Sequence, residues 1–221
     1  MIDRMLSVIA PHLCCGCGKI GSTLCGNCKY DIVSELKTVC IRCQKPCGER
    51  GICASCRLLY SRAWCVGERQ GTLQRLIGLY KFERVRSAYK DLGDLLLAVM
   101  PDLPASVVIV PIPTVAAHIR QRGYDHTLLL ARYIARKRQL PLQQLLVRVT
   151  KTKQRQESAA VREAQAKAAF AVKRNASKDT IYLLIDDVMT TGATLKYATK
   201  ALQAAGATQV WVAVVARQTL D

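Results

Sequence analysis

The sequence predicts an α/β protein, with a parallel sheet flanked by helices and a small cysteine-rich domain in front of it. From residue 63 onward, short apolar runs typical of buried strands alternate with amphipathic helical patterns. This order builds a mostly parallel sheet. Before that point the composition differs, because ten of the eleven cysteines lie between Cys14 and Cys56 and the last is Cys65. We therefore expect two domains, residues 1–62 and residues 63–221.

Composition narrows the class of protein and the kind of partner. Half of the 221 residues are hydrophobic, which supports a sizeable core and excludes wholesale disorder. The formal net charge is +17. Such a balance favours polyanionic partners, namely nucleic acid, acidic membrane surfaces or phosphorylated small molecules.

The sequence predicts no membrane span and no signal peptide. Its apolar runs stay below the roughly 18 residues that cross a bilayer. Residues 1–5 lack the charged start and long apolar core of a signal peptide. We expect a cytoplasmic protein, in which paired cysteines are metal ligands rather than disulfides.

Four Cys-x-x-Cys pairs follow one another in the cysteine-rich domain. The spacing lets both thiolates of a pair reach one tetrahedral ion, and two pairs complete a four-cysteine site. We therefore expect two structural zinc ions, held by Cys14, Cys17, Cys25, Cys28, Cys40, Cys43, Cys53 and Cys56. Short gaps favour two successive zinc ribbons, and interleaved pairing stays open. A disulfide scaffold or a thioredoxin-like redox pair fits poorly, since no signal peptide or βαβ pattern accompanies the pairs.

Apolar periodicity places the helices and strands of the larger domain. The expected helices carry apolar residues on one face and span residues 73–80, 92–99, 128–138 and 195–205. The expected strands are short apolar runs at residues 63–66, 107–110, 145–149, 183–185 and 209–215.

The strand at residues 183–185 ends in chemistry suited to a sugar phosphate. Two carboxylates, Asp186 and Asp187, fall at its carboxyl end, where ligands of parallel sheets bind. The residues that open the next helix are small or carry hydroxyls: Thr190, Thr191, Gly192, Ala193 and Thr194. Their backbone N–H groups and the helix N-terminus suit a phosphate. Two acids alone would equally suit a solvated strand end, and the Thr-Thr-Gly-Ala-Thr run favours the sugar-phosphate site.

A basic loop follows the strand at residues 107–110. The prolines Pro111 and Pro113 position this loop at the same edge of the sheet. In it, Arg120 and Arg122 can offer paired donors to pyrophosphate, and Gly123 permits a close backbone approach. A solvated basic loop is the alternative, and the position after a strand favours ligand contact.

Two other features near this edge have weaker signals. An acid–base pair of Asp125 with His126 is not expected, since adjacent residues on a helix do not face each other. The polar, basic segment 150–167 suits either a mobile lid over the ligand or a solvated connection.

Residues 185–194, Ile-Asp-Asp-Val-Met-Thr-Thr-Gly-Ala-Thr, resemble the phosphoribosyl pyrophosphate (PRPP) motif of type I phosphoribosyltransferases. In that motif the acids contact the ribose hydroxyls and the Thr/Gly loop wraps the 5′-phosphate. Leu-Tyr-Lys-Phe at 79–82, Val-Pro-Ile-Pro at 110–113 and Arg-Gln-Arg-Gly-Tyr at 120–124 extend the likeness. With the cysteine pairs, the chain resembles the ComF family almost throughout. The resemblance implies a double zinc ribbon fused to a type I phosphoribosyltransferase domain.

The resemblance also assigns residues outside the motif. Positions that match the family are Lys81, Pro111, Pro113, Arg120, Arg122, Gly123, Gln154 and Arg162. Positions that depart from its pattern are Asp125, His126, Glu157 and Gln165. These departures surround the side expected for a second substrate. The expected ligand is therefore PRPP with Mg²⁺, while the acceptor and the general base stay unassigned.

Two functions fit these features. The first is a PRPP-binding protein in DNA uptake during natural competence, with single-stranded DNA and a competence helicase or other uptake proteins as partners, and located at the inner membrane through them. The second is an active PRPP-dependent glycosyltransferase that displaces pyrophosphate with a nitrogen acceptor. The charge supports DNA binding, whereas aromatic residues, 5% of the chain, provide few platforms for base stacking.

Overall fold

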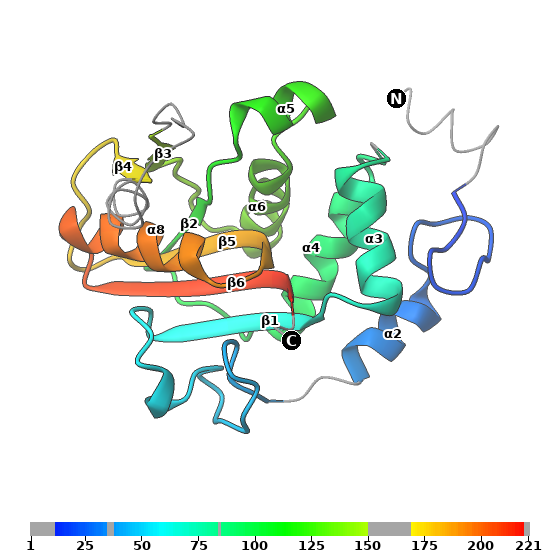
Figure 1. Ribbon diagram of the computed structural model, residues 1–221, viewed down its shortest axis with the longest axis horizontal. Helices are drawn as coiled ribbons and strands as arrows, with labels where there is room; N and C mark the ends of the chain where they lie inside the picture. Colours follow the sequence, from blue (N-terminus) through cyan, green and yellow to red (C-terminus); the bar gives the residue numbers. More distant parts are fainter. Residues whose placement is uncertain (1–11, 35–37, 84, 150–168, 219–221) are drawn as a thin grey trace, which may run out of the picture.

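The main sheet has four parallel strands in the order β1-β6-β5-β2 (Figure 1). The structure is a computed structural model that describes residues 12–34, 38–83, 85–149 and 169–218. The strands of the sheet are β1 (Arg62–Glu68), β2 (Val107–Pro111), β5 (Ile181–Met189) and β6 (Gln209–Arg217). Leu183 at the middle of β5 pairs with Ile109 on one side and Trp211 on the other. The predicted parallel α/β architecture is confirmed.

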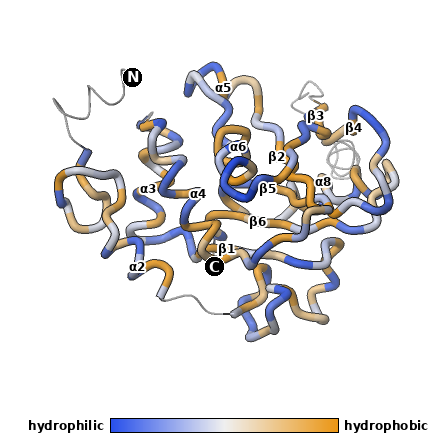
Figure 2. The backbone as a smooth tube through the Cα atoms, turned by 180° about the vertical axis from the view of Figure 1, so that it is seen from behind, coloured by the Kyte–Doolittle hydropathy of each residue, from blue (hydrophilic) through white to orange (hydrophobic). Residues whose placement is uncertain are grey.

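Each face of the sheet has its own hydrophobic core. Leu183 and Ile185 point into one core, and Tyr182 and Leu184 into the other. Hydrophobic segments accordingly gather along the central strands (Figure 2). Because helices cover both faces, the strands are apolar at nearly every position instead of alternating with polar residues.

The helices divide between the two faces. Helices α3 (Gly71–Lys81), α4 (Ala88–Val99) and α6 (His126–Arg138) share the core of Leu183. Helix α8 (Ala193–Ala204) and the antiparallel pair β3 (Leu146–Arg148) and β4 (Phe170–Val172) share the core of Leu184. The strand predicted at residues 145–149 thus belongs to a separate small sheet.

The cysteine-rich segment packs as two parts on opposite faces of the sheet. The first part includes helix α2 (Gly26–Ser34), and its Cys14 and Leu24 join the core of α3 and α4. The second part includes the short helix η1 (Ala54–Cys56), and it contributes to the core of α8. The division into domains 1–62 and 63–221 stays a prediction.

Contacts with the sheet domain hold both parts in place. Arg75 Nε of α3 donates to the Cys15 carbonyl at 2.6 Å, and Lys29 Nζ lies 2.6 Å from Asp94 Oδ2. On the other face, the Ala63 backbone N–H donates to the Arg50 carbonyl at 2.8 Å. Within the described ranges, no helix is long and apolar enough to cross a membrane.

Candidate functional site

The candidate site lies at the carboxyl edge of the sheet, where the four parallel strands end. β5 continues through both acids, because Asp186 pairs with Val214 of β6 and Met189 pairs with Arg217. The expected strand end at the acids is therefore wrong, and both carboxylates lie within the strand. Neighbouring residues of a strand point to opposite sides, so the two acids have different surroundings.

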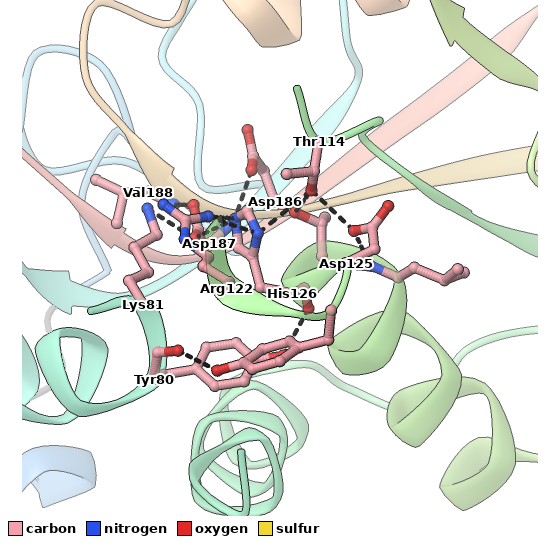
Figure 3. Close-up of polar contacts among 12 residues, drawn as sticks. Tyr80, Lys81, Thr114, Arg122, Asp125, His126, Asp186, Asp187 and Val188 are labelled. Carbon is pink, nitrogen blue, oxygen red and sulfur yellow. Dashed lines mark hydrogen bonds and ion pairs between the residues drawn. The ribbon is translucent and has the colours of Figure 1, made fainter. Parts of the chain in front are cut away.

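Asp187 is buried and ion-paired (Figure 3). Lys81 Nζ, at the end of α3, lies 2.7 Å from Asp187 Oδ2, and His126 Nε2, at the start of α6, lies 2.9 Å from the same oxygen. The Val188 backbone N–H donates to Oδ1 at 2.6 Å. Both oxygens of Asp187 are thus engaged by groups of the protein itself.

The two acids have opposite pKa shifts. Burial alone would raise the pKa of Asp187, but the hydrogen bond from His126 and the charge of Lys81 outweigh it and lower that pKa below its usual range. Burial and the negative charge of Asp187 raise the pKa of Asp186 to about 8. The surroundings therefore favour the ionised form of Asp187 and the protonated form of Asp186.

His126 lies between Asp187 and Arg122 (Figure 3). Arg122 Nη1 is 2.8 Å from Nδ1 and 3.4 Å from Nε2, so the guanidinium lies against the imidazole ring. The ionised carboxylate only accepts hydrogen bonds and the guanidinium only donates them. A neutral ring protonated at Nε2 fits both neighbours, since it donates to Asp187 and leaves Nδ1 free beside Arg122.

The start of α6 holds His126 in this position. Asp125 caps the helix, because its Oδ1 accepts from the Leu128 backbone N–H at 3.0 Å. The Thr114 hydroxyl donates to the same oxygen at 2.8 Å. The Tyr80 hydroxyl donates to the His126 carbonyl at 2.7 Å. Asp125 therefore serves the helix end and does not pair with His126, as expected.

Residues 190–192 join β5 to α8 (Figure 1), and Ala193 and Thr194 are the first two residues of that helix. Gly192 precedes the helix with φ of +76°, a left-handed conformation that favours glycine. Thr190 and Thr191 are exposed, and Thr191 Oγ1 accepts from the Ala193 backbone N–H at 3.4 Å. The free N–H groups of the first turn of α8 thus follow directly after the two acids.

The basic residues of the expected loop lie on a short helix, α5 (Ala116–Arg122), so the loop prediction is wrong there. Gly123 ends this helix with φ of +81°. Arg122 contacts His126, whereas Arg120 is exposed and has no polar partner defined within the described ranges. The expected lid at 150–167 falls outside those ranges, as do four residues with family assignments: Gln154, Glu157, Arg162 and Gln165.

Two residues near the acids are absent from the sequence-based site. His126 follows the N-cap of a helix that starts at the sheet edge, and this position in the sequence is the feature that could have identified it as a site residue. Arg148 of β3 had no comparable signal, because its strand belongs to the second sheet. Its positive charge acts on Asp186 and opposes the rise of that pKa. Its Nε donates to the Pro113 carbonyl at 3.4 Å.

The eight paired cysteines form two clusters, each made of two consecutive pairs. The sulfur atoms within a cluster lie within 4.8 Å of one another, and the members are Cys14, Cys17, Cys25 and Cys28, then Cys40, Cys43, Cys53 and Cys56. The separations between individual sulfurs include 3.6, 3.5 and 3.8 Å. An ion with tetrahedral bonds of about 2.3 Å separates its sulfur ligands by roughly 3.8 Å. Each cluster can therefore hold a metal ion, and the pairing is sequential.

Comparison with known proteins finds matches that include a family model, two relatives and a solved structure. A family model for the phosphoribosyl transferase domain matches residues 126–219. Competence protein F of Haemophilus influenzae is 31% identical over 228 residues, covering 96% of this chain and 93% of that protein. Competence protein ComFC of Bacillus subtilis is 26% identical over 192 residues, covering 81% and 77%. Among solved structures, the allosteric regulatory enzyme of purine biosynthesis is similar at 25% identity with a TM-score of 0.44, covering 59% of this chain and 26% of that enzyme's chain.

Proposed function

This chain belongs to the ComF family of competence proteins, and we propose that it binds PRPP at the carboxyl edge of its sheet. The observation that carries the proposal is the meeting of three kinds of group at that edge. These are the acid Asp186, the cations Lys81 (paired with Asp187) and Arg122 (in contact with His126), and the hydroxyl-rich segment ahead of α8. A sugar bearing phosphate and pyrophosphate needs all three.

Each part of PRPP has a matching group. The loop at 190–194 and the N-terminus of α8 suit the 5′-phosphate. Asp186 is half-buried and accepts a ribose hydroxyl, whereas both oxygens of Asp187 are already engaged. Arg120 and Arg122 suit the pyrophosphate, with Lys81 beside them. Mg²⁺ enters bound to the phosphate oxygens of the ligand, because Mg²⁺ prefers oxygen and is commonly bound through substrate phosphates.

Zinc is the proposed metal of both cysteine clusters. Four thiolates close the coordination shell of a zinc ion and leave no open position for a substrate. The role is therefore structural: each ion would tie a segment with few apolar residues to one face of the sheet.

The proposed process is DNA uptake during natural competence. The names of both relatives, competence protein F and competence protein ComFC, support it. The net charge of +17 supports direct contact with single-stranded DNA, since Lys and Arg bind phosphates with release of counterions. A competence helicase or another uptake protein would then be the partner that brings this cytoplasmic protein to the inner membrane.

Calorimetry with PRPP and Mg²⁺ tests the ligand. We expect the wild type to bind and Asp186→Ala to lose most of the heat of binding. The matched control is Asp179→Ala, an exposed acid just before β5, which should bind as the wild type does. Equal binding by the wild type and Asp186→Ala, or no binding by the wild type, would remove the proposal.

Two further assays distinguish a DNA-binding protein from an active glycosyltransferase. Affinity for labelled single-stranded DNA should fall linearly with the logarithm of salt concentration, and an affinity indifferent to salt argues against DNA as a partner. Pyrophosphate release from PRPP, measured across nucleobases and amines, would identify the chain as an active glycosyltransferase.

A further inference from the structure

We propose that His126 is a positioning residue that couples Arg122 to Asp187 and thereby holds the pyrophosphate side and the ribose side of the site in one arrangement. The inference rests on the proposed function, because those two sides are defined by PRPP. It concerns a residue at which this chain departs from the ComF pattern.

The first step is the burial of the imidazole ring between two charged groups. His126 is 5% exposed, and its Nε2 lies 2.9 Å from Asp187 Oδ2 while its Nδ1 lies 2.8 Å from Arg122 Nη1. No hydrogen bond or ion pair between Arg122 and Asp187 is defined in the described part of the chain. The imidazole therefore fills the space between the carboxylate and the guanidinium.

The second step is that the three side chains come from different elements. Arg122 ends α5, His126 begins α6 and Asp187 lies within β5. Arg122 is part-exposed, and besides His126 its guanidinium lies over the Phe82 ring at 5.9 Å. Contact with a buried ring limits its rotamers, so less entropy is lost when it meets the pyrophosphate.

The third step is that the backbone of His126 is held independently of any ligand. The Tyr80 hydroxyl binds the His126 carbonyl at 2.7 Å, and the Thr114 hydroxyl lies 3.3 Å from Nδ1. On the far side of Asp187, Lys81 supplies a second cation at 2.7 Å. Asp187 therefore stays in place when His126 is replaced, and what changes is the link to Arg122.

Substitution of His126 by glutamine and by phenylalanine tests the link. In His126→Gln the amide N–H₂ can donate to Asp187 and the amide oxygen can accept from Arg122. In His126→Phe an aromatic ring stays in place and both polar contacts are lost. The matched control is His118→Phe, an exposed histidine on α5.

We expect His126→Phe to weaken PRPP and pyrophosphate binding by at least about tenfold, the value of one charge-assisted contact. His126→Gln should stay within about threefold of the wild type. In the His126→Phe background, adding Arg122→Ala should cost less than it does in the wild type, because the part of the Arg122 contribution that depends on the coupling is already lost. Thermal unfolding of each variant identifies any protein that fails to fold.

Two results would overturn the inference. One is wild-type PRPP affinity in folded His126→Phe. The other is an equal loss in folded His126→Gln and His126→Phe, which would mean that imidazole itself contacts the ligand.

The ¹⁵N chemical shifts of the ring give a reading that needs no ligand. The wild type should show a protonated Nε2 and an unprotonated Nδ1, and Arg122→Met should shift the Nδ1 signal. A wild type that binds no PRPP refutes the proposed function and the ligand part of this inference. In that case the shifts still decide whether His126 joins Arg122 to Asp187, and a Nδ1 signal unmoved by Arg122→Met would refute the link.

Discussion

Removal of the Lys81 ammonium should destabilise the fold by about 3 kcal/mol. The Lys81 and Asp187 side chains are only 16% and 6% exposed, and Nζ lies 2.7 Å from Oδ2. In Lys81→Met the carboxylate stays buried without its main countercharge, a change that costs about 3–5 kcal/mol. Because His126 still donates to Asp187 at 2.9 Å, we take the lower end of that range.

Urea unfolding followed by tryptophan fluorescence measures this cost. Trp64 and Trp211 lie on neighbouring strands with ring centroids 5.6 Å apart, so their emission reports on the sheet. The matched control is Lys29→Met, which removes a shorter ion pair of 2.6 Å whose side chains are 30% and 33% exposed. Its expected cost is about 1 kcal/mol or less. Zinc is kept constant throughout.

Asp187→Asn in the Lys81→Met background completes the test. Once the ammonium is absent, neutralising the carboxylate should recover part of the lost stability, giving an interaction energy of about 1–3 kcal/mol between the two substitutions. If Lys81→Met were no less stable than Lys29→Met, the buried ion pair between Lys81 and Asp187 would not have the predicted stabilising effect.

Asp186, Gly93 and the cysteine clusters yield the remaining predictions. Because the folded pKa of Asp186 is about 8, above the usual value of about 4, the free energy of unfolding should fall as pH rises from about 4 to 8, and Asp186→Asn should remove that slope in urea titrations. In Gly93→Ala the added Cβ would clash with the Tyr133 ring and should cost about 1–3 kcal/mol in urea unfolding, whereas in Gly78→Ala on α3 the Cβ meets no atom within 4 Å and the variant should gain up to about 1 kcal/mol. Metal analysis should find about two zinc ions per chain, and a chelator should lower the unfolding temperature.

The main sheet could be predicted because each of its strands has a local apolar pattern that is visible in the sequence without knowledge of the neighbouring strands. The runs at 107–110 and 210–215 are apolar without interruption, which suits burial on both faces of a parallel sheet. The run at 145–149 resembles them apart from Arg148, but Val147 is 42% exposed and its strand pairs with β4. Helix α5 has only seven residues, too few for a periodic pattern.

The cysteines could be predicted as metal ligands from the sequence, but the positions of their clusters relative to the sheet could not. Spacing alone identified four pairs, and it left sequential and interleaved pairing open. Their position on opposite faces depends on how each segment packs: Leu24 joins the core of α3 and α4, and Tyr60 joins that of α8. Such contacts between distant parts of the chain leave no local pattern in the sequence.

The acids show most clearly what a motif does and does not determine. The motif treats Asp186 and Asp187 as an equivalent pair, yet they are neighbours within a strand and their environments differ. Lys81 and His126, distant in sequence, both contact Oδ2 of Asp187, and the Val188 backbone N–H donates to Oδ1. Burial and the charge of Asp187 raise the pKa of Asp186, which stays partly exposed. Because Asp187 is held by contacts within the fold, our proposal assigns the contact with a ribose hydroxyl to Asp186.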